Sequence, residues 1–566
     1  MVYIATLQLK TLIIAVAASC IIINTEIMCE IGEKRPHIIF ILADDMGWND
    51  VSFHGSAQIP TPNIDALAYA GLILNNYYVT PICTPSRSSL MTGKYPIHTG
   101  MQHTVLYAAE PRGLPLTEKI LPQYLRELGY KNHCVGKWHL GHFKREYTPL
   151  HRGFDSHIGY WTGHHDYFDH TAFEQRQWGF DIRRGMDVAY DLHGQYTTDI
   201  ITNESVRIVR SHNTSIPLFL YIAHAAVHSG NPYNPLPAPD STTSKFTHIS
   251  DFARRKYAAM MTHLDYSVGA VVHALSQNNM LNDSIIIFST DNGGPAEGFN
   301  LNAASNWPLR GVKNTLWEGG VRGAALLFSP KIVKKHRVSN QTMHIADWLP
   351  TLFHVAGGNV EHLNATLDGK NMWSSLSEDT KSNRTEILHN IDDIYGSASL
   401  TVGEWKVHKG TNYNGAWDQW YGPAGIRSTT AYNANAVSNC PAGQALNQLN
   451  LLPTVQHMRK MRTDATVDCL KNQNSVSICR PLEKPCLFNV NLDPCEQNNL
   501  ADESFIYSAF ILSRKRHPEI LNSLLERLNA YNETALLPAN LPLDPNGDPR
   551  FFDNTWTNFG DFSKDI

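Results

Sequence analysis

The chain has 566 residues, of which 42% are apolar and 17% are charged. That apolar content can fill a large core, and the charged fraction is too low for a charge-driven disordered chain. Lys and Arg number 47 and Asp and Glu number 52, so the formal net charge is −5. This balance gives no support for nucleic-acid binding, which requires a strongly basic face.

The N-terminus predicts entry into the secretory pathway. Residues 11–24 are apolar and uncharged, and the run is shorter than the about 20 residues that span a membrane. We interpret residues 1–29 as a signal peptide and expect no membrane attachment after its removal, with a retained anchor as the alternative. The mature protein is expected in the lysosome or outside the cell. Seven sequons are typical of a secretory glycoprotein, and they lie at Asn203, Asn213, Asn282, Asn340, Asn364, Asn383 and Asn532.

Three apolar runs predict the strands of a central sheet. They are His37–Asp45, Pro217–His228 and Ser284–Gly294, and each is apolar on both faces before it ends in polar residues. Runs of this kind are typical of buried parallel strands. In such sheets ligands bind beyond the carboxyl ends of the strands.

Helices are predicted between these strands. Thr61 is expected to cap a helix with Pro62 at its first position, and Gly129 is expected to end another. Apolar residues at intervals of three and four between Arg255 and Gln277 predict a helix with one buried face. Alternating strands and helices predict an α/β fold.

The character of the chain changes toward the C-terminus. The alternating segment Leu400–Gly410 predicts an antiparallel strand. We therefore expect a catalytic domain over residues 35–390 and a smaller α+β domain with an antiparallel sheet over residues 391–566.

The segment CTPSR at Cys83–Arg87 is the first candidate for chemistry. Taken alone, Cys83 beside Arg87 is either a nucleophile of low pKa or an inert buried thiol. The segment resembles the C-x-P-x-R motif of the sulfatase family. Further segments carry the resemblance in the same order along residues 35–390, and they are ILADDMGWND, TPNIDALA, GKWHLG, the AVH ending at His228, FSTDNGG and NWPLRGVKNTLWEGGVRG.

Within that family the chain is most similar to animal arylsulfatase B-type enzymes. The resemblance implies an alkaline-phosphatase-like mixed sheet between helices. It also implies that a formylglycine-generating enzyme oxidises Cys83 to an aldehyde in the endoplasmic reticulum. One hydroxyl of the hydrated aldehyde then attacks the sulfur of a sulfate ester, and the second hydroxyl loses its proton to release sulfate.

A metal site is predicted where two of the strands end. Adjacent aspartates face one ion only if the backbone turns after the strand, and either aspartate alone is more often a helix cap or a turn residue. Three carboxylates and one amide suit a hard divalent cation. The resemblance implies one Ca²⁺ bound by the residue derived from Cys83 together with Asp44, Asp45, Asp291 and Asn292.

Basic and histidine residues complete the predicted site. By resemblance, Arg87, Lys137 and Lys313 hold the aldehyde or the sulfate, whose charge grows on oxygen during transfer. His139 is expected to bond the aldehyde hydrate, and His228 to protonate the leaving oxygen. We interpret His224 and His263 as core histidines.

The segment TGHHDYF departs from the family pattern, because His164 stands where many members have serine. An altered substrate mouth is expected there. His164 and His165 either bind substrate or are solvated. The aromatic residues between Trp417 and Tyr421 either stack on a sugar ring or form a plain surface loop.

The expected function is hydrolysis of sulfate monoesters. The likeness favours N-acetylgalactosamine 4-sulfate in glycans, with small sulfated metabolites such as glucosinolates or aryl sulfates as the alternative. Two rivals are a phosphodiesterase or phosphonate hydrolase of the same fold, and an inactive secreted protein that binds sulfated glycans. The oligomeric state is not predicted.

Nine cysteines are an odd number for a secreted protein. Two leave with the signal peptide and Cys83 is converted, so six remain. Cys134 is expected on a buried strand as a free thiol. Five lie in the C-terminal domain, where we expect at most two disulfides, with Cys486 and Cys495 as the first predicted pair.

Overall fold

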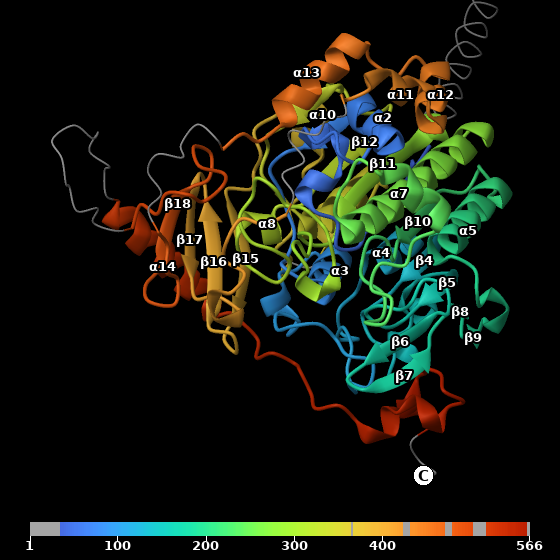
Figure 1. Ribbon diagram of the computed structural model, residues 1–566, viewed down its shortest axis with the longest axis horizontal. Helices are drawn as coiled ribbons and strands as arrows, with labels where there is room; N and C mark the ends of the chain where they lie inside the picture. The colour runs from blue at the N-terminus through green and yellow to red at the C-terminus, as the bar shows by residue number, and fades with distance from the viewer. Residues whose placement is uncertain (1–33, 364–365, 423–430, 470–477, 502–516, 563–566) are drawn as a thin grey trace, which may run out of the picture.

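The computed structural model describes residues 34–363, 366–422, 431–469, 478–501 and 517–562, so the predicted signal peptide lies outside the described residues. A ten-stranded mixed sheet forms the centre of the molecule, with helices on both faces (Figure 1). In sheet order its strands are β13 (Arg337–Ser339), β2 (Leu72–Leu74), β12 (Ala325–Phe328), β11 (Ser284–Thr290), β1 (His37–Ala43), β10 (Leu218–Ala223), β4 (Lys131–Lys137), β5 (Ser156–Tyr160), β8 (Arg183–Arg184) and β9 (Asp187–Val188).

The three predicted apolar runs form adjacent parallel strands, as expected. Strand β1 lies between β10 and β11, with Ile38 opposite Phe219 on one side and Ile285 on the other. Every residue of these three strands is buried. Their carboxyl ends therefore meet at one edge of the sheet, together with the end of β4, which lies parallel to β10.

Two layers of helices cover the sheet, and alternate residues of β1 point into each layer. Ile39 and Ile41 belong to one apolar cluster, whereas Ile38 and Phe40 belong to the other. The first layer contains α2 (Pro62–Ala70), α5 (Thr197–Ser211), α7 (Phe252–Gln277), α11 (Ala434–Asn439), α12 (Pro441–Gln448) and α13 (Val455–Ala465). The second contains α3 (Cys83–Thr92), α4 (Leu121–Glu127), α9 (Trp348–Val355) and α10 (Trp373–Glu378). Helices α6 (Asp240–Thr243) and α8 (Glu318–Val321) are single turns.

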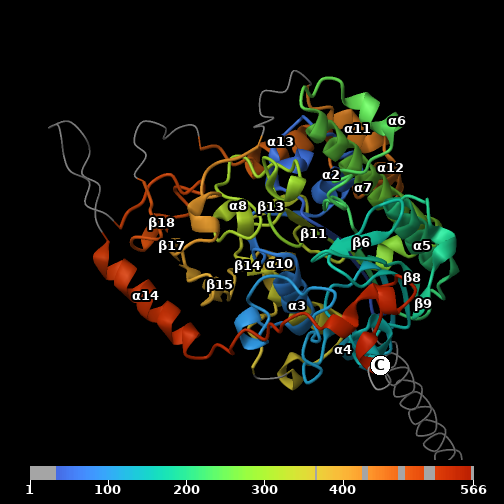
Figure 2. The same cartoon turned by 60° about the horizontal axis from the view of Figure 1, so that its bottom comes forward.

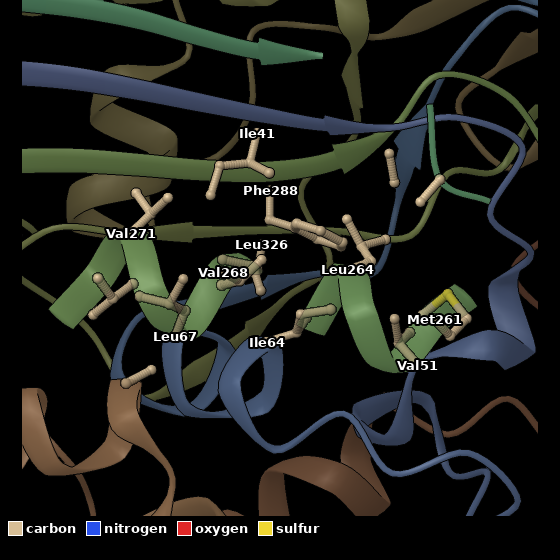
Figure 3. Packing of buried hydrophobic residues seen from close by; sticks show 14 of the residues in the cluster. Ile41, Val51, Ile64, Leu67, Met261, Leu264, Val268, Val271, Phe288 and Leu326 are labelled. Atoms are coloured by element: carbon tan, nitrogen blue, oxygen red, sulfur yellow. The ribbon is translucent and has the colours of Figure 1, made fainter. Parts of the chain in front are cut away.

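Helix α7 confirms the predicted apolar face. The apolar residues of the predicted face are all buried, and they are Tyr257, Met261, Leu264, Val268, Val271 and Leu275. Figure 3 shows Leu264 and Val268 packed beside α2 and below Phe288 of the sheet. Burying each such aliphatic side chain stabilises the fold by about 1.5–3 kcal/mol, which outweighs the modest helix propensity of the valines.

The predicted cap at Thr61 is wrong, although Pro62 does begin α2. The Thr61 hydroxyl accepts a hydrogen bond from the Ser52 amide at 2.9 Å and donates to the carboxylate of Asp65 at 3.1 Å, so it accepts from no amide of the helix. Asp265 of α7 takes its place, since its carboxylate accepts from the amide of Ile64 at 2.9 Å. The prediction for Gly129 is confirmed: it follows α4 with a φ of +82°, where an L side chain is strained.

Two buried carboxyl groups predict that stability falls as the pH rises toward neutrality. Burial raises the pKa of both Asp65 and Asp265 to about 7. In the unfolded chain such groups release their protons near about pH 4. Between these values the unfolded state binds fewer protons than the folded state, so the free energy of unfolding decreases with rising pH.

The melting temperature of the unmodified protein should fall between about pH 5 and about pH 7.5, and we expect this fall to be smaller in Asp265→Asn. The introduced amide still accepts a hydrogen bond but does not titrate. Glu526→Gln, which removes an exposed carboxylate from α14 (Pro518–Asn532), is the control and should leave the loss unchanged. An equal loss in Asp265→Asn and in the unmodified protein would contradict the prediction.

A second, antiparallel sheet contains β15 (Glu386–Asp392), β16 (Ser397–Val402), β17 (Trp405–Lys409) and β18 (Cys486–Asn489). The segment 400–410 is not one strand, because the chain reverses at Gly403, whose φ is +59°. Strand β15 crosses the proposed domain boundary between residues 390 and 391. Helix α14 covers this sheet through Leu524 and Leu528.

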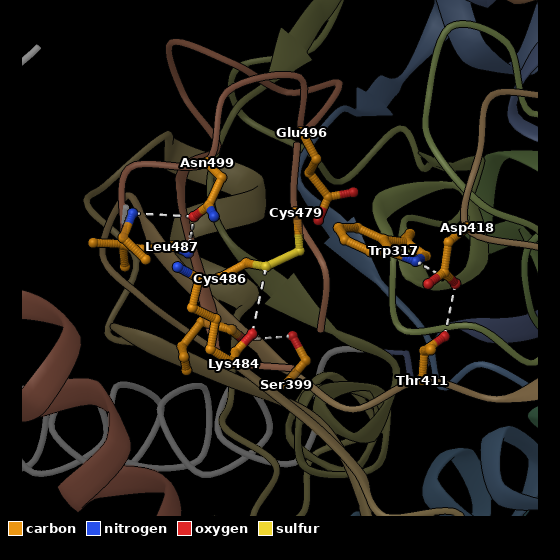
Figure 4. Close-up of a disulfide and its surroundings, with 12 residues drawn as sticks. Trp317, Ser399, Thr411, Asp418, Cys479, Lys484, Cys486, Leu487, Glu496 and Asn499 are labelled. Carbon is orange, nitrogen blue, oxygen red and sulfur yellow. Dashed lines mark hydrogen bonds between the residues drawn. A yellow bond between two sulfur atoms is a disulfide. The ribbon is translucent and has the colours of Figure 1, made fainter. Parts of the chain in front are cut away.

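The predicted disulfide between Cys486 and Cys495 is wrong. Cys479 bonds to Cys486, as Figure 4 shows, and Cys469 bonds to Cys495. Cys486 begins β18, which pairs with β17 and forms no hairpin toward Cys495. Two disulfides do form, and among the cysteines that the structure describes the free thiols are those of Cys83, Cys134 and Cys440. Cys134 lies buried in β4, as expected.

Two short ribbons complete the described elements. Strands β3 (Tyr77–Tyr78) and β14 (Met343–His344) form one, and the hairpin of β6 (Thr171–Glu174) and β7 (Gln177–Phe180) forms the other. The C-terminal residues, red in Figures 1 and 2, run from α14 to this hairpin. There the amide of Phe180 donates to the carbonyl of Asn554 at 2.8 Å. Among the described residues, no helix is long and apolar enough to cross a membrane.

Candidate active site

The sequence-predicted residues meet at the carboxyl edge of the central strands. Asp44 and Asp45 follow β1, and Asp291 and Asn292 follow β11. Lys137 ends β4, and the segments with His139 and His228 follow β4 and β10. Four adjacent parallel strands therefore deliver residues that lie up to about 250 positions apart in sequence to one place.

Cys83 enters this place from the helix on the other side. It is the first residue of α3, a helix of ten residues, and is fully buried. The amino end of a helix carries partial positive charge and favours an anion beside it. Burial raises the pKa of the Cys83 thiol to about 12, which argues against a thiolate nucleophile at this position.

Four possible ligand groups surround a common point. One oxygen each of Asp44, Asp45 and Asp291 and the sulfur of Cys83 all lie within 4.8 Å of one another. The backbone turns at Asp45, whose φ is +62°, so the two adjacent aspartates both face this point. The turn that the sequence required after the strand is present.

Asn292 adds an oxygen that fits a hard cation. Its amide nitrogen donates to Asp45 at 2.7 Å, which leaves the side-chain oxygen buried without a partner among the described residues. An unpaired buried acceptor is costly unless something binds it. Three carboxylates and this amide form the all-oxygen donor set that Ca²⁺ prefers.

Each carboxylate also contacts a buried cationic side chain. Lys137 lies 2.7 Å from Asp44, and Lys313 lies 2.8 Å from Asp45. The guanidinium of Arg87 lies 2.8 Å from Asp291 and 3.4 Å from Asp44. All of these side chains are almost completely buried, so solvent screens their charges little.

Their mutual attraction offsets the cost of burial. Burial alone disfavours the charged amine of Lys313, yet Asp45 raises its pKa above the ordinary value. Burial likewise disfavours a charged Asp45, but Lys313 and His228 hold its pKa below the ordinary value. For Asp291, burial and the nearby Asp44 prevail and raise the pKa. A bound cation would favour the ionised form of that carboxylate.

His139 and His228 approach from two sides. His139 donates from Nε2 to the carbonyl of Leu106 at 3.0 Å, while its buried Nδ1 has no partner among the described residues. His228 donates from Nδ1 to the carbonyl of Ser229 at 2.7 Å, and its Nε2 lies 3.4 Å from Asp45. Burial, and then the charge of Lys313, lower the pKa of His228 to about 3.

A cavity of about 420 Å³ opens above this centre. That volume lies in the range of small-molecule sites. Cys83, His139, His228 and Lys313 form part of its wall. Residues that the sequence reasoning missed form much of the remainder, and they include Thr104, Tyr107, Phe173, Glu174, Asn314, Tyr395 and Tyr413.

His164 and His165 take different roles. The ring of His164 lines the cavity and lies parallel to that of His228, with 5.8 Å between the ring centroids. His165 is buried and bonds the carbonyl of Asp181 and the hydroxyl of Thr197. Of these two histidines, only His164 lines the cavity, at the position where the sequence predicts an altered substrate mouth.

Glu174 is the most informative residue that the sequence reasoning missed. Its carboxylate lines the cavity 3.8 Å from His164 and accepts from the amides of Ala108 and Gly163. Burial raises the pKa of Glu174 to about 7. It lies on β6, outside every segment that resembles the family, so no motif marked it.

The other residues that the sequence analysis singled out lie outside the cavity wall. Trp417 packs edge-on against Phe299, whose neighbours Asn300 and Leu301 line the cavity. The Trp417–Tyr421 loop therefore supports the wall from behind. His224 is a core residue that bonds Ser267 at 3.1 Å, as interpreted. His263 is only partly buried and contacts Thr242 and Asp199, so the core interpretation does not hold there.

Known proteins share this sequence and architecture. The family model described as Sulfatase matches residues 36–358. Arylsulfatase J of Mus musculus is 38% identical over 540 residues, which cover 93% of this chain and 80% of that protein. N-acetylgalactosamine-6-sulfatase of Homo sapiens is 30% identical over 439 residues, which cover 75% of this chain and 80% of that protein.

Solved structures agree with these relatives. The crystal structure of Ps i-CgsB in complex with k-i-k-neocarrahexaose superposes with a TM-score of 0.66 and 25% sequence identity. The match covers 92% of this chain and 99% of that chain. The alkaline-phosphatase-like architecture expected from the sequence is thereby confirmed.

Proposed function

This chain belongs to the sulfatase family and is a sulfuric ester hydrolase, and from that premise we propose that it removes sulfate from a sulfated sugar. The observation that carries the proposal is the single buried centre at which Cys83, three carboxylates and three cationic side chains meet below a cavity. An anionic ester is attracted to such a centre, whereas a neutral substrate gains little from it.

Cys83 is proposed to function as formylglycine. A buried thiol whose pKa is raised to about 12 is a poor nucleophile at neutral pH, which supports conversion to another group. Once made by a formylglycine-generating enzyme, the hydrated aldehyde supplies one hydroxyl to attack sulfur and a second to release sulfate. The amino end of α3 stabilises negative charge at that position.

One Ca²⁺ ion is proposed at the oxygen cluster. Asp44, Asp45, Asp291 and the unpaired oxygen of Asn292 would hold it, and its charge would polarise the sulfate and the attacking hydroxyl. The carboxylates are already balanced by three cationic side chains. A divalent ion therefore leaves the centre positive, as an anion site requires.

The remaining residues have roles that their positions support. Lys137, Lys313 and Arg87 would hold the aldehyde or the sulfate, whose oxygens gain charge in the transition state, and of the three Lys313 lines the cavity. His139, which lines the cavity together with Cys83 and has an unpaired Nδ1, would bond the aldehyde hydrate, and Nε2 of His228 would protonate the leaving oxygen. The negative charge of a bound ester beside His228 favours its protonated form, which a general acid needs.

The proposed substrate is N-acetylgalactosamine 4-sulfate in a glycan, in line with the arylsulfatase B-like motifs. A relative named N-acetylgalactosamine-6-sulfatase and a structural neighbour solved in complex with k-i-k-neocarrahexaose support a sulfated sugar. Small sulfate esters such as glucosinolates are the alternative substrates. The six sequon asparagines within the described residues are all exposed, which supports a glycoprotein of the lysosome or the extracellular space.

Parallel assays of an aryl sulfate and the matching aryl phosphate test this function against the phosphatase-type rivals. We expect kcat/KM for the aryl sulfate to be at least about tenfold higher than for the aryl phosphate. The reason is that the site is built to bind one anion of low charge. Chelation with EGTA should abolish turnover and added Ca²⁺ should restore it. Faster turnover of the phosphate would overturn the proposal, and no turnover of any sulfate ester would favour the glycan-binding rival.

A further inference from the structure

We propose that Trp178 and Tyr233 form a second carbohydrate subsite at the rim of the catalytic cavity, where the sugar next to the sulfated one is bound. The inference rests on the proposed function for its ligand class. It arises from an exposed pair of aromatic rings that the sulfate chemistry does not use.

The two rings form a stacked pair on the surface. Their centroids lie 5.5 Å apart with 10° between the ring planes. Trp178 is 49% exposed and Tyr233 is 53% exposed, although both are large apolar side chains. Two aromatic rings that remain in water do not contribute the free energy that their burial in the core would provide. Exposed apolar pairs of this kind are typical of binding surfaces.

The pair is continuous with the catalytic cavity. Phe173 lines the cavity, and its ring packs edge-on against Trp178 at 6.0 Å. On the other side, Pro232 lines the cavity and directly precedes Tyr233. A chain of sugars whose terminal sulfate reaches Cys83 therefore meets these rings where it leaves the cavity.

Hydrogen bonds fix the pair in place before any ligand arrives. The Tyr233 hydroxyl donates to Asp169 and receives a bond from the side-chain amide of Asn231 at 3.1 Å. Asn231 is fully buried, and its side chain also bonds the backbone of Thr171 and of Phe173 in β6. The loop that carries Tyr233 is thus tied to the hairpin that carries Trp178.

The C-terminal residues hold the same hairpin from behind. The indole of Trp556 donates to the carbonyl of Ala172 at 3.0 Å, and Gly179 lies against Pro549 and Trp556 so closely that no Cβ would fit. Contacts within the fold already hold the two aromatic side chains in place. Little conformational entropy is therefore lost when a ligand binds, as a preformed subsite requires.

Pyranose rings suit this surface. One face of such a ring presents several C–H groups, which pack against the negative face of an aromatic ring and exclude water. Ring hydroxyls at the edge of the sugar remain free to bond water or Gln175, which lines the cavity at the turn of the hairpin.

Calorimetric titration of two ligands tests the subsite without requiring turnover. The ligands are N-acetylgalactosamine 4-sulfate and a chondroitin 4-sulfate tetrasaccharide that ends in the same sugar, and the protein is the full chain carrying Cys83→Ala. We expect the tetrasaccharide to bind about tenfold more tightly, as one or two aromatic contacts provide. Trp178→Ala and Tyr233→Ala should each remove most of that gain.

Phe252→Ala is the matched control, because Phe252 is 60% exposed on α7 but does not line the cavity. It should keep the full gain. Equal affinities for the two ligands, a gain that survives both substitutions, or no binding of either ligand would overturn the subsite. Aryl sulfate turnover by the unmodified chain, measured separately, shows whether the proposed function itself has failed.

Discussion

Cys83→Ser should lower the rate of sulfate ester turnover by about 10⁴-fold or more while the fold remains intact. A serine hydroxyl at the start of α3 can still attack sulfur. It has no second hydroxyl whose proton loss would expel the sulfate, so one sulfo group should stay bound per chain. Mass spectrometry of the peptide with residue 83 should show this covalent sulfate in the variant and an aldehyde in the unmodified protein.

Cys440→Ser is the matched control for this substitution. Cys440 is also a buried free thiol, and its sulfur accepts from the amide of Gly443 at the start of α12. Serine is a favoured residue at this cap position, so stability and turnover should both be retained. An unmodified thiol at Cys83 in protein from its native source, together with normal turnover, would contradict the formylglycine mechanism.

His228→Ala should slow hydrolysis of a sulfated sugar by about 10²–10⁴-fold but slow hydrolysis of nitrophenyl sulfate much less. A sugar alkoxide is a poor leaving group and needs a proton as the bond to sulfur breaks. A nitrophenolate leaves without one. The measurement is kcat/KM for both esters in the variant and in the unmodified protein.

His263→Asn is the control, since His263 lies on α7 away from the cavity wall. It should change neither rate. Equal losses for both esters in His228→Ala would show that this ring positions the substrate or the carboxylate of Asp45 and does not donate the proton. A second explanation, loss of the fold, is checked by the melting temperature.

The central architecture was predictable because burial leaves a strong pattern in sequence. A strand covered on both faces is mostly apolar without alternation, and the buried runs of β1, β10 and β11 have this pattern. Parallel strands of one sheet then bring their carboxyl ends together. Asp44, His228 and Asp291 therefore converge, although each is ambiguous by itself.

Features that depend on distant partners were not predictable. Thr61 has the right residue type for a cap, but Asp265 of another helix reaches the same amides. Cys486 pairs with Cys479, seven residues before it, and not with Cys495, because sequence spacing alone does not distinguish the two thiols. Glu174 and Trp178 lie on a short hairpin whose place over the cavity is set by contacts with residues far along the chain.

The loop after Lys313 is also held by residues far along the chain, namely Asp418, Cys479 and Cys486. Figure 4 shows Trp317 beside the Cys479–Cys486 disulfide, with its indole donating to Asp418 at 2.9 Å. Family resemblance placed Lys313 in the site. The residues that pack against the loop after Lys313 lie outside the segments that resemble the family. The motif alone therefore could not predict these contacts.

The path of the C-terminal residues sets an order in time for the maturation of this protein. Phe180 and Ala172 bond Asn554 and Trp556, which lie far beyond them in the chain and are therefore synthesised much later. Until those residues have been synthesised, the hairpin over the cavity lacks two of its contacts. The wall of the cavity is therefore completed later than the strands whose carboxyl ends carry Asp44, Lys137 and Asp291.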